Sequence, residues 1–124
     1  MTYLQKTFVR HGHPRHIILA YVGLMWGVYF LWFHNWVGAV TAILLSAVLG
    51  RILTDDVREE NLAQTTLGKI MLLHMHPINL ALQIAGLALA FYGVWIHDGM
   101  YVMVAVTVIL LGHLWGWHKV NDAL

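Results

Sequence analysis

Cysteine is absent from this chain of 124 residues. Its absence excludes disulfide bonds, thiolate metal sites and catalysis by a thiol nucleophile. Charged residues are also scarce: they make up 10% of the chain, against about 25% in an ordinary soluble domain. The formal net charge is only +1, which argues against a nucleic-acid partner. A chain this poor in charge and 60% hydrophobic is expected to bury its apolar surface in a lipid bilayer.

Four apolar stretches of the sequence are long enough to cross a bilayer as helices. A hydrocarbon core about 30 Å thick needs about 20 residues of α-helix. The stretches are continuously apolar rather than alternating, which favours helix over strand. Very short turns join the first to the second and the third to the fourth, so each pair should form an antiparallel hairpin. The predicted spans are Pro14–Phe33, Trp36–Leu53, Pro77–Ile96 and Met100–Trp117.

The fold predicted from these spans is an all-α, polytopic membrane protein with four transmembrane helices arranged as two tandem hairpins. A single transmembrane domain covers residues 1–124. Residues 54–68 form a polar linker that we expect to lie along the membrane interface. No signal-peptide pattern precedes the first span, so that span is expected to be retained.

The cations predict the orientation of the chain. All seven lie before the first span, between the second and third, or after the fourth, and the two remaining turns hold none. Under the positive-inside rule both termini and the linker are cytoplasmic, in an inner or plasma membrane. The cations are Lys6, Arg10, Arg15, Arg51, Arg58, Lys69 and Lys119.

The sequence also contains an internal repeat with an offset of 63 residues. When residues 2–50 are aligned with residues 65–113 without a gap, 13 of 49 positions are identical. The identities include histidine, proline, tyrosine and tryptophan, which rarely match by chance in two apolar segments. We interpret the pattern as a tandem duplication of one two-span unit. Because each unit has an even number of spans, the copies insert in the same direction and form a parallel repeat.

The most distinctive repeated motif is His-x-His-Pro, which precedes the first and third spans. Proline fits the first turn of a helix, so Pro14 and Pro77 predict helix starts. His13 and His76 would then lie at the helix caps. The positive end of the helix dipole disfavours imidazolium there, and neutral imidazole is the form that binds metals.

Nine histidines in so short a chain suggest a cofactor site. Seven of them fall on the predicted cytoplasmic side, where several could meet. Imidazole ligands with few carboxylates suit iron, zinc or copper rather than magnesium or calcium, and iron is the favoured metal. The predicted metal ligands are His11, His13, His74, His76, His113 and His118. A b-type haem held by His16 and His113 is the alternative cofactor.

Short segments of the chain resemble the membrane family of iron-dependent 2-hydroxy fatty acid dioxygenases. The resemblance rests on His11-x-x-Pro14-x-His16 with Gly23, on His74-x-x-Pro77-x-Asn79 with Gln83 and Gly86, on Gly112-His113, and on the ending Ala123-Leu124. It implies iron-dependent oxidation of a lipid-derived 2-hydroxy acid. It also implies that His11 and His113 are ligands, with His74 in the second copy.

Two classes of function follow from these features. The leading hypothesis is a membrane oxygenase that uses a metal at a cytoplasmic histidine cluster and receives a lipid-like substrate from the bilayer. The alternatives are a non-catalytic accessory subunit of a larger membrane complex and a membrane subunit that binds b-type haem. Assembly into a homo-oligomer stays open in each case. Exposed aromatic side chains on the spans fit the accessory subunit, and the sparse intramembrane charge weighs against a proton or ion pathway.

Overall fold

The computed structural model describes residues 2–117, with side chains for residues 2–114, and all regular secondary structure in that part of the chain is helical. The helices are α1 (Tyr3–His11), α2 (Pro14–Trp32), α3 (Trp36–Leu53), α4 (Glu59–Ala63), α5 (Thr66–Leu73), α6 (Pro77–Trp95) and α7 (Gly99–Trp117). The all-α class predicted from the sequence is confirmed. Three helices, α2, α3 and α6, are long and apolar enough to cross a membrane. The apolar part of α7 that the structure describes, Gly99–Leu114, is shorter.

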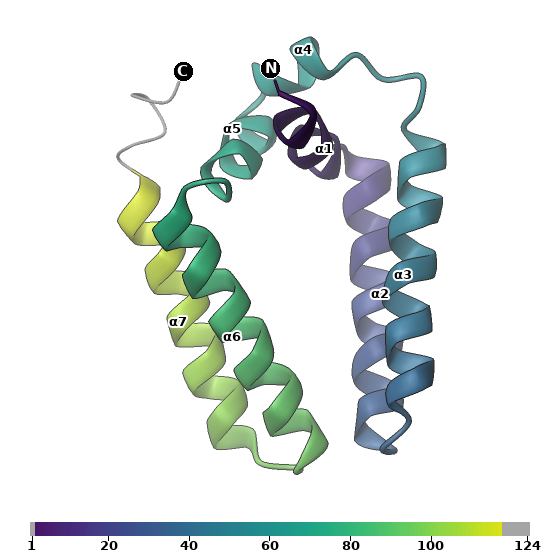
Figure 1. The fold of residues 1–124 in the computed structure, drawn as a ribbon, viewed down its shortest axis with the longest axis vertical. Coiled ribbons are helices and arrows are strands. Elements are labelled where there is room, and N and C mark those ends of the chain that lie inside the picture. The colour runs from purple at the N-terminus through teal and green to yellow at the C-terminus, as the bar shows by residue number, and fades with distance from the viewer. Residues whose placement is uncertain (1, 118–124) are drawn as a thin grey trace.

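Two helical hairpins form the body of the molecule. Figure 1 shows α2 packed along α3 and α6 packed along α7, with α1, α4 and α5 covering one end of both hairpins. We call these three short helices the cap. The predicted interfacial linker, residues 54–68, is less simple than expected because it contains α4 and the first turn of α5.

The His-x-His-Pro motifs begin α2 and α6, as the sequence predicts. Pro14 and Pro77 each occupy the first turn of a long helix. His13 is the N-cap residue of α2 and accepts a hydrogen bond at Nδ1 from the backbone N–H of Arg15, at 3.3 Å. His76 caps α6 in the same way. The two histidines therefore satisfy donors that proline-led helices would otherwise leave unpaired.

The opposite ends of the two hairpins contact one another through tryptophan and histidine. His34 and His97 end the turns after α2 and α6, and both adopt φ of 57°, in the left-handed region. The rings of Trp32 and His97 lie 3.9 Å apart and those of His34 and Trp95 lie 4.6 Å apart. His97 also donates from Nε2 to the carbonyl oxygen of Trp32, at 2.7 Å. The tryptophan of each hairpin thus contacts the histidine of the other hairpin.

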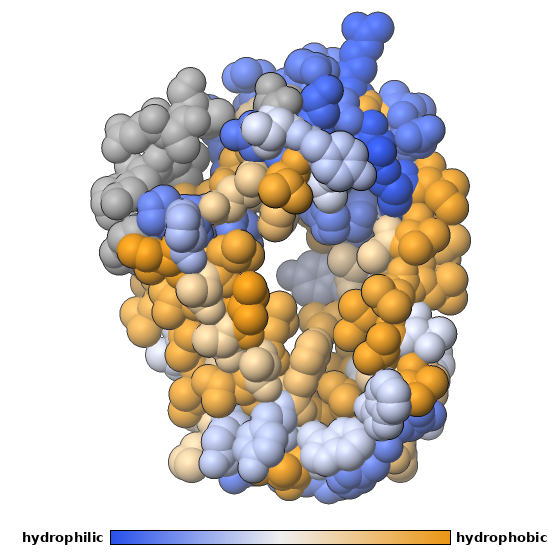
Figure 2. Space-filling view, viewed as in Figure 1, coloured by the Kyte–Doolittle hydropathy of each residue, from blue (hydrophilic) through white to orange (hydrophobic). Residues whose placement is uncertain are grey.

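Apolar side chains are mostly on the outside of the hairpins, as expected of helices that face lipid. Figure 2 shows this apolar surface, hollowed between the two hairpins, with hydrophilic residues gathered on the cap. Within each hairpin the helices approach closely at glycine: a Cβ on Gly23 would lie 2.0 Å from Ser46 Oγ, and one on Gly86 would lie 2.4 Å from Ile109. The only buried hydrophobic cluster among the described residues lies in the cap and joins Val9 to Leu62 and Ala63.

Candidate functional site

Six of the eight histidines with described side chains lie in pairs. Among residues 2–114, no three His, Asp or Glu side chains come together as a metal-binding group. Instead His11 lies against His16, with ring centres 4.0 Å apart, and His74 lies against His113, with ring centres 4.9 Å apart. The sequence predicted that six histidines form one cluster of metal ligands. The structure does not bring five of them together in one cluster, and the sixth, His118, lies outside the described residues.

Two of the predicted ligands have a structural role. His13 and His76 cap α2 and α6, and their Nδ1 atoms accept backbone hydrogen bonds. The pair predicted for haem, His16 and His113, is not brought together either, because each ring contacts a different histidine. His34 and His97 form a third ring contact at the other end of the hairpins, at 5.3 Å.

The first pair lines a cavity of about 360 Å³ where α1 meets the cap end of the α2–α3 hairpin. His11 donates from Nδ1 to the carbonyl oxygen of Thr7, at 2.8 Å. His16 is 3% exposed, and its buried Nδ1 has no hydrogen-bond partner among the described residues. Gly50 makes room for this imidazole, because a Cβ there would lie 2.9 Å from the ring.

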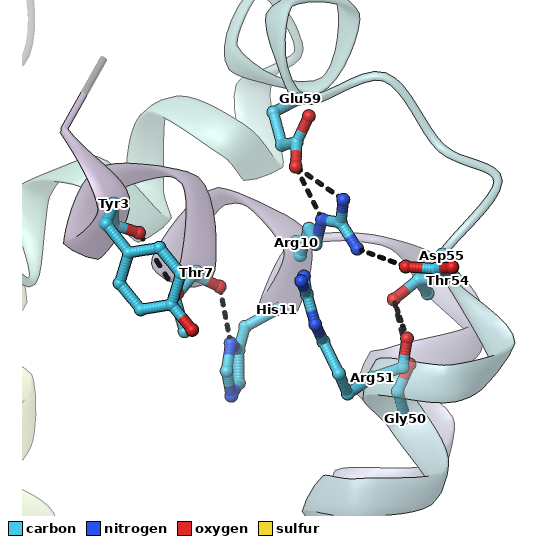
Figure 3. Close-up of polar contacts among 9 residues, drawn as sticks. All are labelled: Tyr3, Thr7, Arg10, His11, Gly50, Arg51, Thr54, Asp55 and Glu59. Atoms are coloured by element: carbon cyan, nitrogen blue, oxygen red, sulfur yellow. Dashed lines mark hydrogen bonds and ion pairs between the residues drawn. The ribbon is translucent and has the colours of Figure 1, made fainter.

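Two arginines line the first cavity, and only one of them is paired with carboxylates. Arg10 is buried and pairs with Glu59 and Asp55, with Nε–Oε1 and Nη1–Oδ1 distances of 2.7 and 3.4 Å (Figure 3). Arg51 also lines the cavity, and its guanidinium has no ion pair or hydrogen bond among the residues with described side chains. Figure 3 shows it extending from α3 toward α1. This surplus positive charge disfavours a metal cation at His11 and His16.

The second pair has a different environment. His74, at the C-cap of α5, and His113, on α7, both lie 2.8 Å through Nδ1 from the carbonyl oxygen four residues earlier. A carbonyl oxygen only accepts, so Nδ1 of His74 must carry the proton, and Nδ1 of His113 carries it in the tautomer that donates to the Ile109 carbonyl. In the neutral imidazole, Nε2 then holds the lone pair. Metal-binding histidines in proteins are commonly oriented by such an Nδ1–H bond to a backbone carbonyl.

Two amide side chains, one of them buried, lie beside the second pair. Asn79 is fully buried and donates from Nδ2 to the carbonyl oxygen of Leu73, at 3.2 Å. This bond orients its Oδ1 as an acceptor for Gln83 Nε2, at 3.3 Å. Gln83 Nε2 also lies 3.0 Å from His113 Nδ1, to which it can donate only when that Nδ1 is unprotonated. The Gln83 amide and the Ile109 carbonyl therefore favour opposite tautomers of His113. The sequence marks Asn79 and Gln83 as polar residues within a span, but it does not show that both lie beside an imidazole pair.

The two pairs occupy equivalent places in the two halves of the chain, but their chemistry differs. His74 lies 63 residues after His11, whereas the second imidazole comes from α2 in the first half and from α7 in the second. At the same offset Arg10 and Arg51 correspond to Leu73 and Leu114. The second pair therefore lacks the cations of the first.

Comparison with known proteins gives no family for this chain. No family model matches it, and neither curated proteins nor solved structures gave a match. The functional argument therefore rests on the site itself.

Proposed function

We propose that the protein is a four-span membrane protein, formed by tandem duplication, that binds a transition metal at His74 and His113. The starts of α1, α2 and α3 each lie 63 residues before those of α5, α6 and α7, which supports the duplication. The reciprocal contacts Trp32–His97 and His34–Trp95 fit a pseudo-two-fold axis between the hairpins, because such an axis repeats every contact with its partners exchanged. On this proposal α7 is the fourth span and the cap is cytoplasmic.

The observation that carries the metal proposal is the close pair itself, in which His74 donates from Nδ1 to the Ile70 carbonyl and His113 Nδ1 lies 2.8 Å from the Ile109 carbonyl. A metal bound to two imidazoles at about 2.0–2.1 Å, with an angle near tetrahedral, places the two ring centres about 5 Å apart. The separation of 4.9 Å between His74 and His113 fits this geometry, whereas the 4.0 Å between His11 and His16 is short for it.

Protonation is compatible with a metal at the second pair. Burial lowers the pKa of His74, and His113 lowers it further against the opposing effect of the Ile70 carbonyl. The ring is therefore neutral at pH 7, as metal binding requires. Two protein nitrogens leave several coordination positions open. If the metal is iron, these open positions would allow it to oxidise an apolar substrate with dioxygen, which is the activity that the family resemblance implies.

A cobalt titration tests the proposal. The full chain, purified in mild detergent with a tag that contains no histidine and treated with a chelator, is titrated with Co²⁺. We expect the visible absorption of bound Co²⁺ to increase until about one equivalent has been added. In His74→Ala the metal affinity should fall at least tenfold, because a ligand is lost. His11→Ala is the matched control, since His11 occupies the equivalent position and makes the same bond to a backbone carbonyl. It should leave the affinity within twofold.

Equal loss in His74→Ala and His11→Ala would contradict the assignment, and so would wild-type protein that binds no Co²⁺, Zn²⁺ or Fe²⁺. Elemental analysis of the same samples counts the metal directly. A visible absorption band typical of haem in the purified protein would favour the haem alternative.

A further inference from the structure

The cavity at His11 and His16 has features of a binding site that the metal proposal does not use. Its volume of about 360 Å³ falls within the roughly 300–1,000 Å³ of ligand pockets in proteins. Among the residues with described side chains, it holds one buried polar atom without a partner, Nδ1 of His16, and one exposed guanidinium without a partner, that of Arg51. A buried polar group normally has a hydrogen-bond partner, so Nδ1 of His16 points to a ligand, and Arg51 supplies a positive charge beside it.

The charge of the cavity selects an anion. Glu59 and Asp55 neutralise Arg10, but the described residues offer Arg51 no carboxylate partner. The phenol of Tyr3 and the hydroxyl of Thr7 add polar groups at the α1 wall, although Thr7 already donates to the carbonyl oxygen of Tyr3. Guanidinium and phosphate form strong, charge-assisted hydrogen bonds.

The other wall of the cavity is apolar. Ala47, Val48 and Ile52 form it, all from the candidate membrane span α3. Val48 and Ile52 are 56% and 62% exposed, so this wall continues onto the surface that faces lipid. A ligand that fits must therefore combine an anionic head with an apolar body.

We propose that this cavity binds the phosphate of an anionic phospholipid. Arg51 and His16 contact the phosphate oxygens, and the acyl chains leave the cavity along Val48 and Ile52. The second half of the chain has no equivalent site, because Leu114 and Asn79 replace Arg51 and His16 at the offset of 63 residues. The proposal is independent of the metal at His74 and His113.

The test measures lipid binding by the full chain in an uncharged detergent. Native mass spectrometry quantifies retained phosphatidylglycerol and phosphatidylcholine over a range of added lipid. We expect phosphatidylglycerol to bind at least tenfold more tightly, because only its head carries a net charge. Arg51→Leu, which introduces the residue found in the second half, should weaken phosphatidylglycerol binding about tenfold, and Arg51→Lys should recover part of the loss.

Arg58→Leu is the matched control, since it removes an exposed cation from the same end of the molecule but outside the cavity. It should change the affinity less than twofold. Equal weakening by Arg51→Leu and Arg58→Leu would overturn the proposal, because it would show only general attraction by positive charge. Competition by millimolar inorganic phosphate without any preference for phosphatidylglycerol would overturn it too, since the cavity would then hold a soluble anion.

Discussion

Gly68→Ala is expected to destabilise the cap by about 3 kcal/mol, at the upper end of the cost of overpacking. A Cβ on Gly68 would lie 1.9 Å from the carbonyl oxygen of Leu62 and 2.7 Å from its carbonyl carbon. These are backbone atoms, so no side-chain rotation can relieve the clash. α5 must move away from α4, and the movement breaks the two hydrogen bonds of the Thr65 hydroxyl, which donates to the Leu62 carbonyl and accepts from the Gly68 N–H.

Amide hydrogen exchange locates this effect. Because the cap contains its own small cluster of Val9, Leu62 and Ala63, we expect faster exchange in α1, α4 and α5 with little change in α3 or α6. Gly99→Ala is the control: nothing lies within 4 Å of a Cβ at Gly99. At that helical position alanine should be neutral or stabilise by up to about 1 kcal/mol. Equal exchange in the two variants would show that α4 and α5 tolerate the added methyl.

Much of the fold could be predicted because its signals are local. Proline after His-x-His marks the starts of α2 and α6, and the length of each apolar run sets where the helices end. The predicted spans differ from α2, α3, α6 and α7 by one residue at most at either end. The cap could not be predicted in this way. Its packing depends on contacts between α1 and α5, which are far apart in sequence, and on the close approach at Gly68.

The candidate site was harder to predict than the helices. Counting histidines includes both members of the pair His74–His113, on which the metal proposal rests. It does not show which imidazoles meet, because that depends on the rotation of each helix about its axis. Counting histidines also does not distinguish those that cap a helix, such as His13, from those whose rings could bind a ligand. The place of Arg51 in the cavity beside His16 was also not predicted, because a cation near a span end is the ordinary signal of membrane orientation.

Glu59→Gln is expected to destabilise the cap by about 2 kcal/mol, between the values for breaking exposed and fully buried ion pairs. The side chains of Arg10 and Glu59 are only 10% and 15% exposed, and two guanidinium nitrogens contact Glu59 Oε1. An uncharged amide leaves the Arg10 charge buried, with only the long 3.4 Å contact to Asp55 remaining. The change should loosen α1 from α4, and hydrogen exchange in α1 is the readout.

The dependence on pH identifies the ion pair as the cause. A hydrogen bond from its own backbone N–H and the nearby Arg10 lower the pKa of the Glu59 carboxyl. In the unfolded chain the same group titrates at about pH 4.3. A lowered folded-state pKa gives stability that is present above the unfolded value and lost as the pH falls through the folded one. The difference in cap stability between wild type and Glu59→Gln should therefore be constant from about pH 5 to 8 and shrink below about pH 4.

The ion pair of Arg15 and Asp56 provides the matched control. These side chains are 61% and 72% exposed and lie 3.8 Å apart, so Asp56→Asn should cost less than about 0.5 kcal/mol. A difference between wild type and Glu59→Gln that persists unchanged to pH 3 would point to packing of the side chain rather than its charge. Similar costs for Glu59→Gln and Asp56→Asn would show that burial adds nothing to the Arg10–Glu59 pair, and the cap would then depend on its apolar cluster alone.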